Sequence, residues 1–135
     1  MQAFLMDALP DFQIVDGRAV FRPSGKVSLR EATALVTAAI RLARERAIGR
    51  LLVVTSGWAE LPSPSVSERY EFAKEWAEAA ESSIRVAVVA RPQLIDHEKF
   101  GVTVARNRGL IADVFTSEEQ ALAWLLNDKE PRVNA

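Results

Sequence analysis

The chain has 135 residues, of which 49% are hydrophobic and 26% charged, with a formal net charge of -1 and no cysteine. This length fits one domain with its own core. The balanced charge argues against a nucleic-acid binder, which usually carries a basic excess on one face. The lack of cysteine excludes disulfides and thiolate chemistry. No apolar stretch approaches the roughly 20 residues of a bilayer span, and the first residues lack a basic leader. We therefore expect a soluble, cytoplasmic protein without a membrane span or a nucleic-acid partner.

The first predicted element is a β-hairpin. Residues 12–15 and 19–22 are short extended runs joined by Asp16-Gly17. An Asp-Gly pair between apolar runs is typical of a two-residue turn that needs positive φ at both positions. The second run ends at the breaker Pro23-Ser24-Gly25.

Beyond the hairpin, apolar runs alternate with amphipathic segments. Strands are expected over 50–56, 84–90 and 110–115, and helices over 28–49, 65–80, 96–108 and 116–126. The pairs Ser28/Glu31, Ser65/Glu68 and Thr116/Glu119 have the spacing of capping boxes. Strands that alternate with helices favour right-handed crossovers and a largely parallel sheet. We therefore expect an α/β fold with a mixed sheet of about five strands covered by about four helices.

Several single residues carry further expectations about these helices. Gly49 and Gly109 stand where left-handed helix caps belong. Gly101 would let its helix approach the sheet closely. The buried stripe of the second helix is expected to contain Val66, Tyr70, Ala73, Trp76, Ala77 and Ala80. The core should span about 12–126, and the tail 127–135 is expected to be flexible.

The site is expected beyond the carboxyl ends of the parallel strands, where open α/β sheets usually bind ligands. The candidate binding residues, for a protein partner or a ligand, are Ser56, Gly57, Trp58, Leu61, Arg91 and Phe100. Trp58 lies in the loop after the central strand. It would either anchor an interface from an exposed position or fold back over the sheet edge.

Ser63 and Ser65 lie near the start of the second helix, where free backbone donors favour an anion. Arg91 could face them across the same crevice. The alternative is that Ser65 only caps its helix and Arg91 is a surface residue.

No catalytic or metal site is expected. Ser56, Asp96 and His97 could suggest a triad, but the two neighbours Asp96 and His97 are unlikely to converge on one nucleophile. Asp96, His97 and Glu98 are consecutive, which is the wrong spacing for one ion. Asp96 is instead expected to cap the third helix, and no cofactor is expected.

The ordered set of segments resembles the STAS domain family, and more closely its SpoIIAA-like branch. The resemblance is carried by the run 50–54, the turn 61–65, residues 70–73, the run 86–89, the segment 100–109, and Val114-Phe115 with 121–125. In the anti-sigma factor antagonists of this family, a serine in an Asp-Ser-Ser-Gly turn is phosphorylated and thereby switches binding to a kinase. The resemblance makes Ser63 or Ser65 the phosphorylation candidate. Here no aspartate precedes either serine and no glycine follows.

Two functions follow as hypotheses. The first is a non-enzymatic regulatory domain that binds a protein partner through the loop 56–65 and the second helix. The second is a binder of a small apolar or anionic, lipid-like ligand, with Trp58, Leu61 and Phe100 lining an apolar mouth. Homodimerisation through an exposed helix face is a further expectation.

Overall fold

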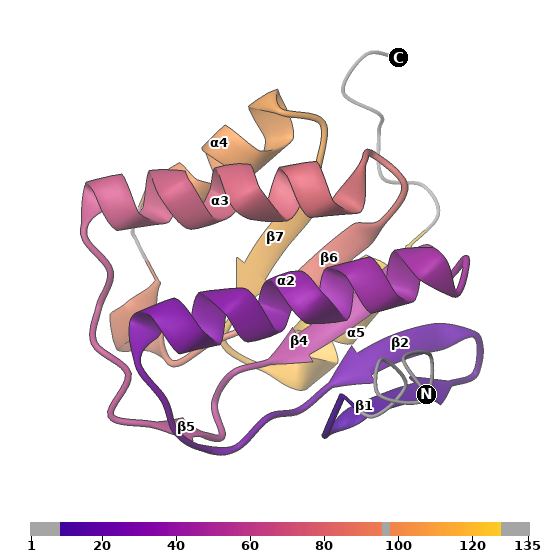
Figure 1. Cartoon of the computed structure of the whole chain (residues 1–135), viewed down its shortest axis with the longest axis horizontal. Helices are drawn as coiled ribbons and strands as arrows, with labels where there is room; N and C mark the ends of the chain where they lie inside the picture. Colours follow the sequence, from indigo (N-terminus) through magenta and orange to yellow (C-terminus); the bar gives the residue numbers. More distant parts are fainter. Residues whose placement is uncertain (1–8, 96–97, 128–135) are drawn as a thin grey trace, which may run out of the picture.

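A computed structural model describes residues 9–95 and 98–127. Within them, four α-helices and a five-stranded sheet alternate along the chain, together with a separate pair of two-residue strands (Figure 1). The elements in chain order are β1 Phe12–Val15, β2 Arg18–Phe21, β3 Gly25–Lys26, α2 Leu29–Glu45, β4 Arg50–Val54, β5 Trp58–Ala59, α3 Val66–Ala80, β6 Arg85–Val89, the 3-10 turn η1 Pro92–Leu94, α4 Phe100–Asn107, β7 Ile111–Phe115 and α5 Glu118–Leu125. The α/β prediction is confirmed.

The main sheet has the order β1-β2-β4-β6-β7, antiparallel only between β1 and β2. The hairpin turn is as predicted, because Asp16 has φ 51° and Gly17 has φ 81°. The three strands that follow helices are parallel to one another and to β2. The predicted mixed sheet is therefore confirmed.

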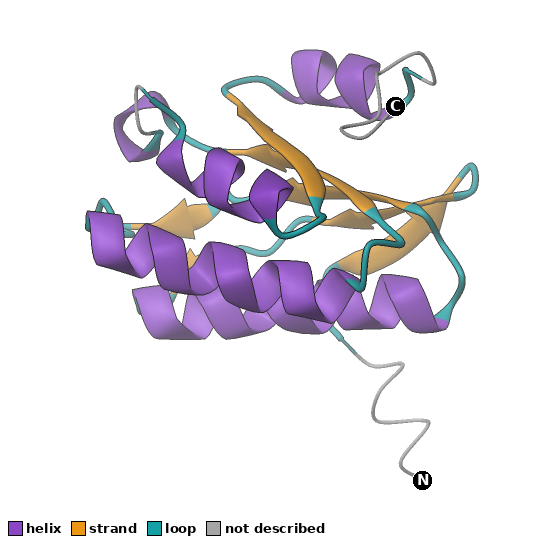
Figure 2. Ribbon diagram, turned by 90° about the horizontal axis from the view of Figure 1, so that it is seen from above, coloured by secondary structure: helices purple, strands orange, loops and turns teal. Residues whose placement is uncertain are grey.

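Helices cover both faces of the sheet, but unequally. In Figure 2, α5 lies alone on one side of the sheet, while the other three helices lie on the opposite side. Side chains along β4 point alternately to the two faces of the sheet. Leu51 and Val53 belong to the core cluster under α2, α3 and α4, and Leu52 and Val54 belong to the core cluster under α5. This two-sided burial explains why β4 is apolar at every position after Arg50.

Two of the three predicted capping boxes are confirmed. The Ser28 and Ser65 hydroxyls accept hydrogen bonds from the backbone N–H of Glu31 and Glu68, at 3.0 and 3.1 Å, and both glutamates bond back. The third box is wrong. Ser117, rather than Thr116, caps α5 by accepting from Gln120 N at 3.1 Å. Phe115 is paired with Val89 in the sheet, so Thr116 is needed to connect the strand to the helix, and the cap falls on Ser117.

The predicted left-handed cap at Gly49 is wrong. Ala47 takes that conformation, with φ 60°, and the next residue, Ile48, donates from its N–H to the Ala43 carbonyl at 2.9 Å. The helix therefore ends two residues earlier than the glycine indicates. Gly109 has φ 95° after α4, and Leu110 N donates to Ala105 O at 2.9 Å, so that cap is confirmed.

The helix predicted over 96–108 is shorter than expected. It begins at Phe100 after Lys99, which has φ 50° and makes no side-chain cap. Asp96, its predicted cap, lies outside the described residues. A Cβ at Gly101 would lie 3.7 Å from Phe72 and 3.9 Å from Arg69. These are ordinary contact distances, so Gly101 lies against α3 without an unusually close approach, and the prediction that it approaches the sheet is wrong.

The stripe predicted for the second helix is partly wrong. Ala73, Ala77 and Ala80 are buried as expected, but Val66 is 66% exposed because it starts the helix beyond the covered part of the sheet. Trp76 is half-buried against Phe72, with ring centroids 4.6 Å apart, and its indole N–H donates to Thr33 O of α2 at 3.2 Å. This hydrogen bond joins α3 to α2, and Figure 1 shows the two helices side by side on the same face of the sheet.

Candidate functional site

The loops that follow β4 and β6 meet at one edge of the sheet, which we call the carboxyl-end rim (residues 55–65, 90–95 and 116–117). Thr55 N donates to Val89 O and Ala90 N donates to Phe115 O, both at 2.9 Å, so the three parallel strands end at the same level. The exposed side chain of Arg91 donates from Nη2 to Ser56 O at 3.1 Å. The two candidates Ser56 and Arg91 are therefore brought together.

Trp58 does not form the exposed anchor that is one of the two sequence-based interpretations. It is only 2% exposed and packs edge-on against Phe21, with ring centroids 6.4 Å apart and planes at 78°. Its own strand, β5, pairs in parallel with β3, so that Trp58 faces Gly25. The tryptophan folds back into the core because this short pairing turns the loop toward the sheet.

Gly57 has a structural reason to be glycine. A Cβ at this position would lie 2.6 Å from the Pro23 carbonyl oxygen, which no side chain tolerates. Its own carbonyl accepts from Gly25 N at 3.2 Å. Gly57 thus closes the loop against the segment that leads into α2. Nothing in the two-residue strands β3 and β5 is periodic enough for sequence reasoning to find them.

Ser63 and Ser65 differ in what their hydroxyls do. The Ser65 hydroxyl caps α3 and lies 3.3 Å from the Ser67 hydroxyl, whereas the Ser63 hydroxyl accepts only a long hydrogen bond of 3.4 Å from Arg69 Nη2. Arg91 contacts Ser56, and neither serine is among its hydrogen-bond partners. The cation beside the loop is therefore Arg69, on the first turns of α3.

Sequence reasoning missed Arg69, although a signal was present. Arg69 stands four residues before Ala73, which is 1% exposed, so it lies on the inward face of α3. There it donates from Nη1 to Leu94 O in η1 at 3.1 Å, in addition to its bond to Ser63. A charged residue on the apolar stripe of a helix is the sequence feature that could have identified it.

A cavity of about 140 Å³ lies between the sheet and the three helices on this face. Trp58 and Leu61 line it, as do Arg69 and Lys99, while Ser56, Gly57, Arg91 and Phe100 do not. Of the three residues predicted to line an apolar mouth, Trp58 and Leu61 thus line this cavity and Phe100 does not. Its other walls are almost entirely apolar, and most of them come from α2, α3, α4 and strands β6 and β7.

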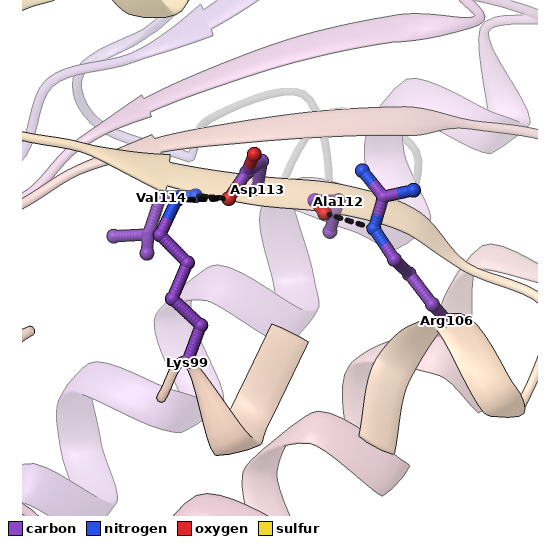
Figure 3. Close-up of polar contacts among 5 residues, drawn as sticks. All are labelled: Lys99, Arg106, Ala112, Asp113 and Val114. Carbon is purple, nitrogen blue, oxygen red and sulfur yellow. Dashed lines mark hydrogen bonds and ion pairs between the residues drawn. The ribbon is translucent and has the colours of Figure 1, made fainter. Parts of the chain in front are cut away.

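Helix α4, which forms one wall of the cavity, is held to β7 near both of its ends (Figure 3). Lys99 Nζ lies 2.8 Å from Asp113 Oδ1, which also accepts from Val114 N at 2.8 Å. At the other end, Arg106 Nε donates to Ala112 O at 3.1 Å. The charge of Lys99 is thus neutralised by Asp113, which also lines the cavity.

The basic residue at the end of α4 is also engaged with a neighbouring helix. Arg108 donates to the Tyr70 hydroxyl at 2.8 Å and lies over its ring, 5.5 Å from the centroid. In the described ranges, no three His, Asp or Glu side chains lie close enough together to hold a metal ion. Asp96 and His97 lie outside these ranges. None of the described helices is long and apolar enough to cross a bilayer.

Comparison with known proteins bears on the fold. The structure is similar to a crystal structure of a candidate anti-sigma factor antagonist from Thermotoga maritima, with a TM-score of 0.51 and 14% identity over 90% of this chain and 98% of that chain. The chain shares the fold of that structure. An NMR structure of the protein TM1081 gives a TM-score of 0.47 and 17% identity over 87% of both chains. The structure of the anti-sigma factor antagonist SpoIIAA in its unphosphorylated form gives a TM-score of 0.41 and 17% identity over 84% of this chain and 96% of that chain. No protein-family model matches the sequence, and no curated protein matches it.

Proposed function

We propose that this chain is a non-enzymatic regulatory domain that binds a protein partner through the carboxyl-end rim and the start of α3. The observation that carries the proposal is the fold, which the chain shares over 90% of its length with a candidate anti-sigma factor antagonist. Proteins so described act by binding other proteins. A cytoplasmic location, self-association and the absence of catalysis remain predictions that accompany this proposal.

The start of α3 has the surface chemistry that a partner would need. Val66 is the most exposed of the large hydrophobic side chains in the described ranges, at 66%, and it is flanked by the exposed residues Ser65 and Ser67. Ser56 and Arg91 lie on the same rim and are also exposed. An apolar side chain surrounded by polar ones is a common arrangement at protein interfaces.

A phosphorylation switch in this loop would act on Ser63. The Ser65 hydroxyl already accepts the Glu68 backbone N–H and caps α3, so a phosphate there would have to replace the cap. The Ser63 hydroxyl is exposed, and among the described residues its one hydrogen bond comes from the Arg69 guanidinium, which would pair with an added phosphate. Incubation with extract containing ATP, followed by intact-mass measurement, would test this. We expect Ser63→Ala to abolish any added phosphate and Ser65→Ala to retain it.

Site-specific photo-crosslinking in the source cells tests partner binding. A photoreactive residue at Val66 should capture a defined protein, and the same residue at Arg41 should not. Arg41 is a matched control because it is exposed near the end of α2, away from the rim. The capture should disappear when Arg91→Glu is added. Equal capture from both positions, or capture from neither, would refute the proposed surface.

The comparisons give no support to the alternative of a lipid-like ligand. That alternative rests on the cavity alone, and its volume limits which ligand could be considered.

A further inference from the structure

We propose that the cavity under α3 is a binding site for a compact apolar carboxylate, with Arg69 holding the carboxylate. The proposal goes beyond partner binding at the rim and does not depend on it. Three observations carry it: the size of the cavity, its apolar walls, and the guanidinium of Arg69 at its edge, which forms no ion pair with an acidic side chain of residues 9–95 and 98–127.

The volume sets the size of the apolar body. The cavity measures about 140 Å³, and an engineered apolar cavity of about 150 Å³ is known to stay dry and to bind benzene. Sites for drug-sized ligands are larger, at roughly 300–1,000 Å³. The cavity therefore suits a body of about six carbons, and the acyl chain of a membrane lipid would not be enclosed.

The walls determine the chemistry of that body. They combine the aromatic residues Trp58, Phe72 and Trp76 with small and branched side chains from both the sheet and the helices, such as Val36, Ala73, Val88, Ala90 and Val114. Thr33, Thr55, Arg69, Lys99 and Asp113 are the polar residues among the lining set, and Lys99 is paired with Asp113 at 2.8 Å. An apolar ring or branched chain would match such walls by shape and burial.

Arg69 supplies the polar end of the site. Both of its hydrogen bonds go to neutral acceptors, Leu94 O at 3.1 Å and the Ser63 hydroxyl at 3.4 Å. No acidic side chain in the described part of the chain forms an ion pair with it. Ser63 is exposed and Leu94 is half-buried, so the guanidinium lies where the cavity approaches the surface. A carboxylate that replaced the long bond to Ser63 would gain a charge-assisted, bidentate contact.

The test is a titration of the methyl-labelled protein with benzoate, benzyl alcohol and acetate, followed by NMR. Benzoate should shift the methyl signals of Val88 and Val114 in a saturable way. Benzyl alcohol has the same ring without the charge and should bind about tenfold more weakly or worse, because it lacks the charge-assisted contact. Acetate, which has the charge without the ring, should leave these methyl groups unchanged.

Three variants locate the two halves of the site. Arg69→Gln keeps donors for Leu94 and Ser63 but removes the charge, and it should weaken benzoate binding about tenfold or more. Arg91→Gln is the matched control, since Arg91 is an arginine of the same edge that does not line the cavity, and it should bind as the wild type does. Ala90→Leu places extra carbons in the cavity and should abolish binding.

Three results would overturn the proposal. The first is the absence of methyl shifts with benzoate in the folded wild-type protein. The second is equal affinity for benzyl alcohol and benzoate, which would remove the role of Arg69 even if that variant failed to fold. The third is unchanged benzoate binding by Ala90→Leu. Loss of partner capture at Val66 would refute the proposed function and leave these three results unaffected.

Discussion

Replacing Trp58 by alanine should strongly destabilise the protein, because this side chain belongs to the core. Trp58 is 2% exposed and packs edge-on against Phe21. Truncation of a buried Phe or Trp to alanine costs about 3–5 kcal/mol, which includes lost burial and the cavity left behind. Domains of this size have a total free energy of unfolding of about 5–15 kcal/mol. The substitution should therefore remove about a fifth of the stability or more.

Urea unfolding followed by circular dichroism measures this loss without relying on tryptophan fluorescence. With a slope of about 2 kcal/mol per molar urea, a loss of about 4 kcal/mol lowers the midpoint by about 2 M. Trp58→Phe is the matched control: it keeps an aromatic ring against Phe21 and should cost much less. A loss below about 1 kcal/mol for Trp58→Ala is the range of an ordinary surface change. That result would mean that the loop is not folded onto the sheet and that the argument from burial is wrong.

Three further predictions concern local features of the chain. Ser65→Ala should lower the free energy of unfolding by about 1 kcal/mol because it removes the α3 cap. Ser63→Ala should change the free energy of unfolding by less than about 0.5 kcal/mol. Equal losses for the two variants would contradict the assignment of the cap to Ser65. In Gly17→Ala the added Cβ would have no neighbouring atom within 4 Å, but the backbone would have to keep φ 81°. The substitution should therefore lower the free energy of unfolding by about 1 kcal/mol through backbone strain alone. A neutral result would argue against the two-residue turn. Arg85→Lys should cost about 1–2 kcal/mol and speed amide hydrogen exchange in α5, because a lysine has one nitrogen in place of the fork of two that binds Asn127 O and Trp124 O; unchanged exchange would show that this arginine does not hold α5.

The sequence predicts the sheet and the helices well, because both depend on short-range patterns. The Asp16-Gly17 turn and the Ser28 and Ser65 caps are local signals, and each is confirmed by its own geometry. Errors occur where two local signals compete. At the start of α5, Thr116 and Ser117 are both good caps, and only the length of the β6–β7 pairing decides in favour of Ser117. That pairing is a long-range property.

The candidate site was predicted less well, because it depends on how loops return to the core. Strand direction alone places Ser56 and Arg91 on one edge, and they are in contact. The burial of Trp58, in contrast, requires the two-residue pairing of β3 with β5, which joins segments about 30 residues apart. Similarly, the link from Arg69 to Leu94 joins α3 to a turn that no periodic pattern indicates.

The cavity raises a question of stability that bears on its role. Because a cavity of about 140 Å³ leaves its apolar lining without contacts on one side, the chain forgoes part of the stability that a filled core would have. Larger side chains at Ala73 or Ala90, which are only 1% and 8% exposed, would recover part of it. If the cavity is only a packing defect, Ala90→Leu should raise the free energy of unfolding and change nothing else. If it is a binding site, the same variant should gain stability and lose benzoate binding together, as expected when a protein keeps a less stable arrangement because its function needs the space.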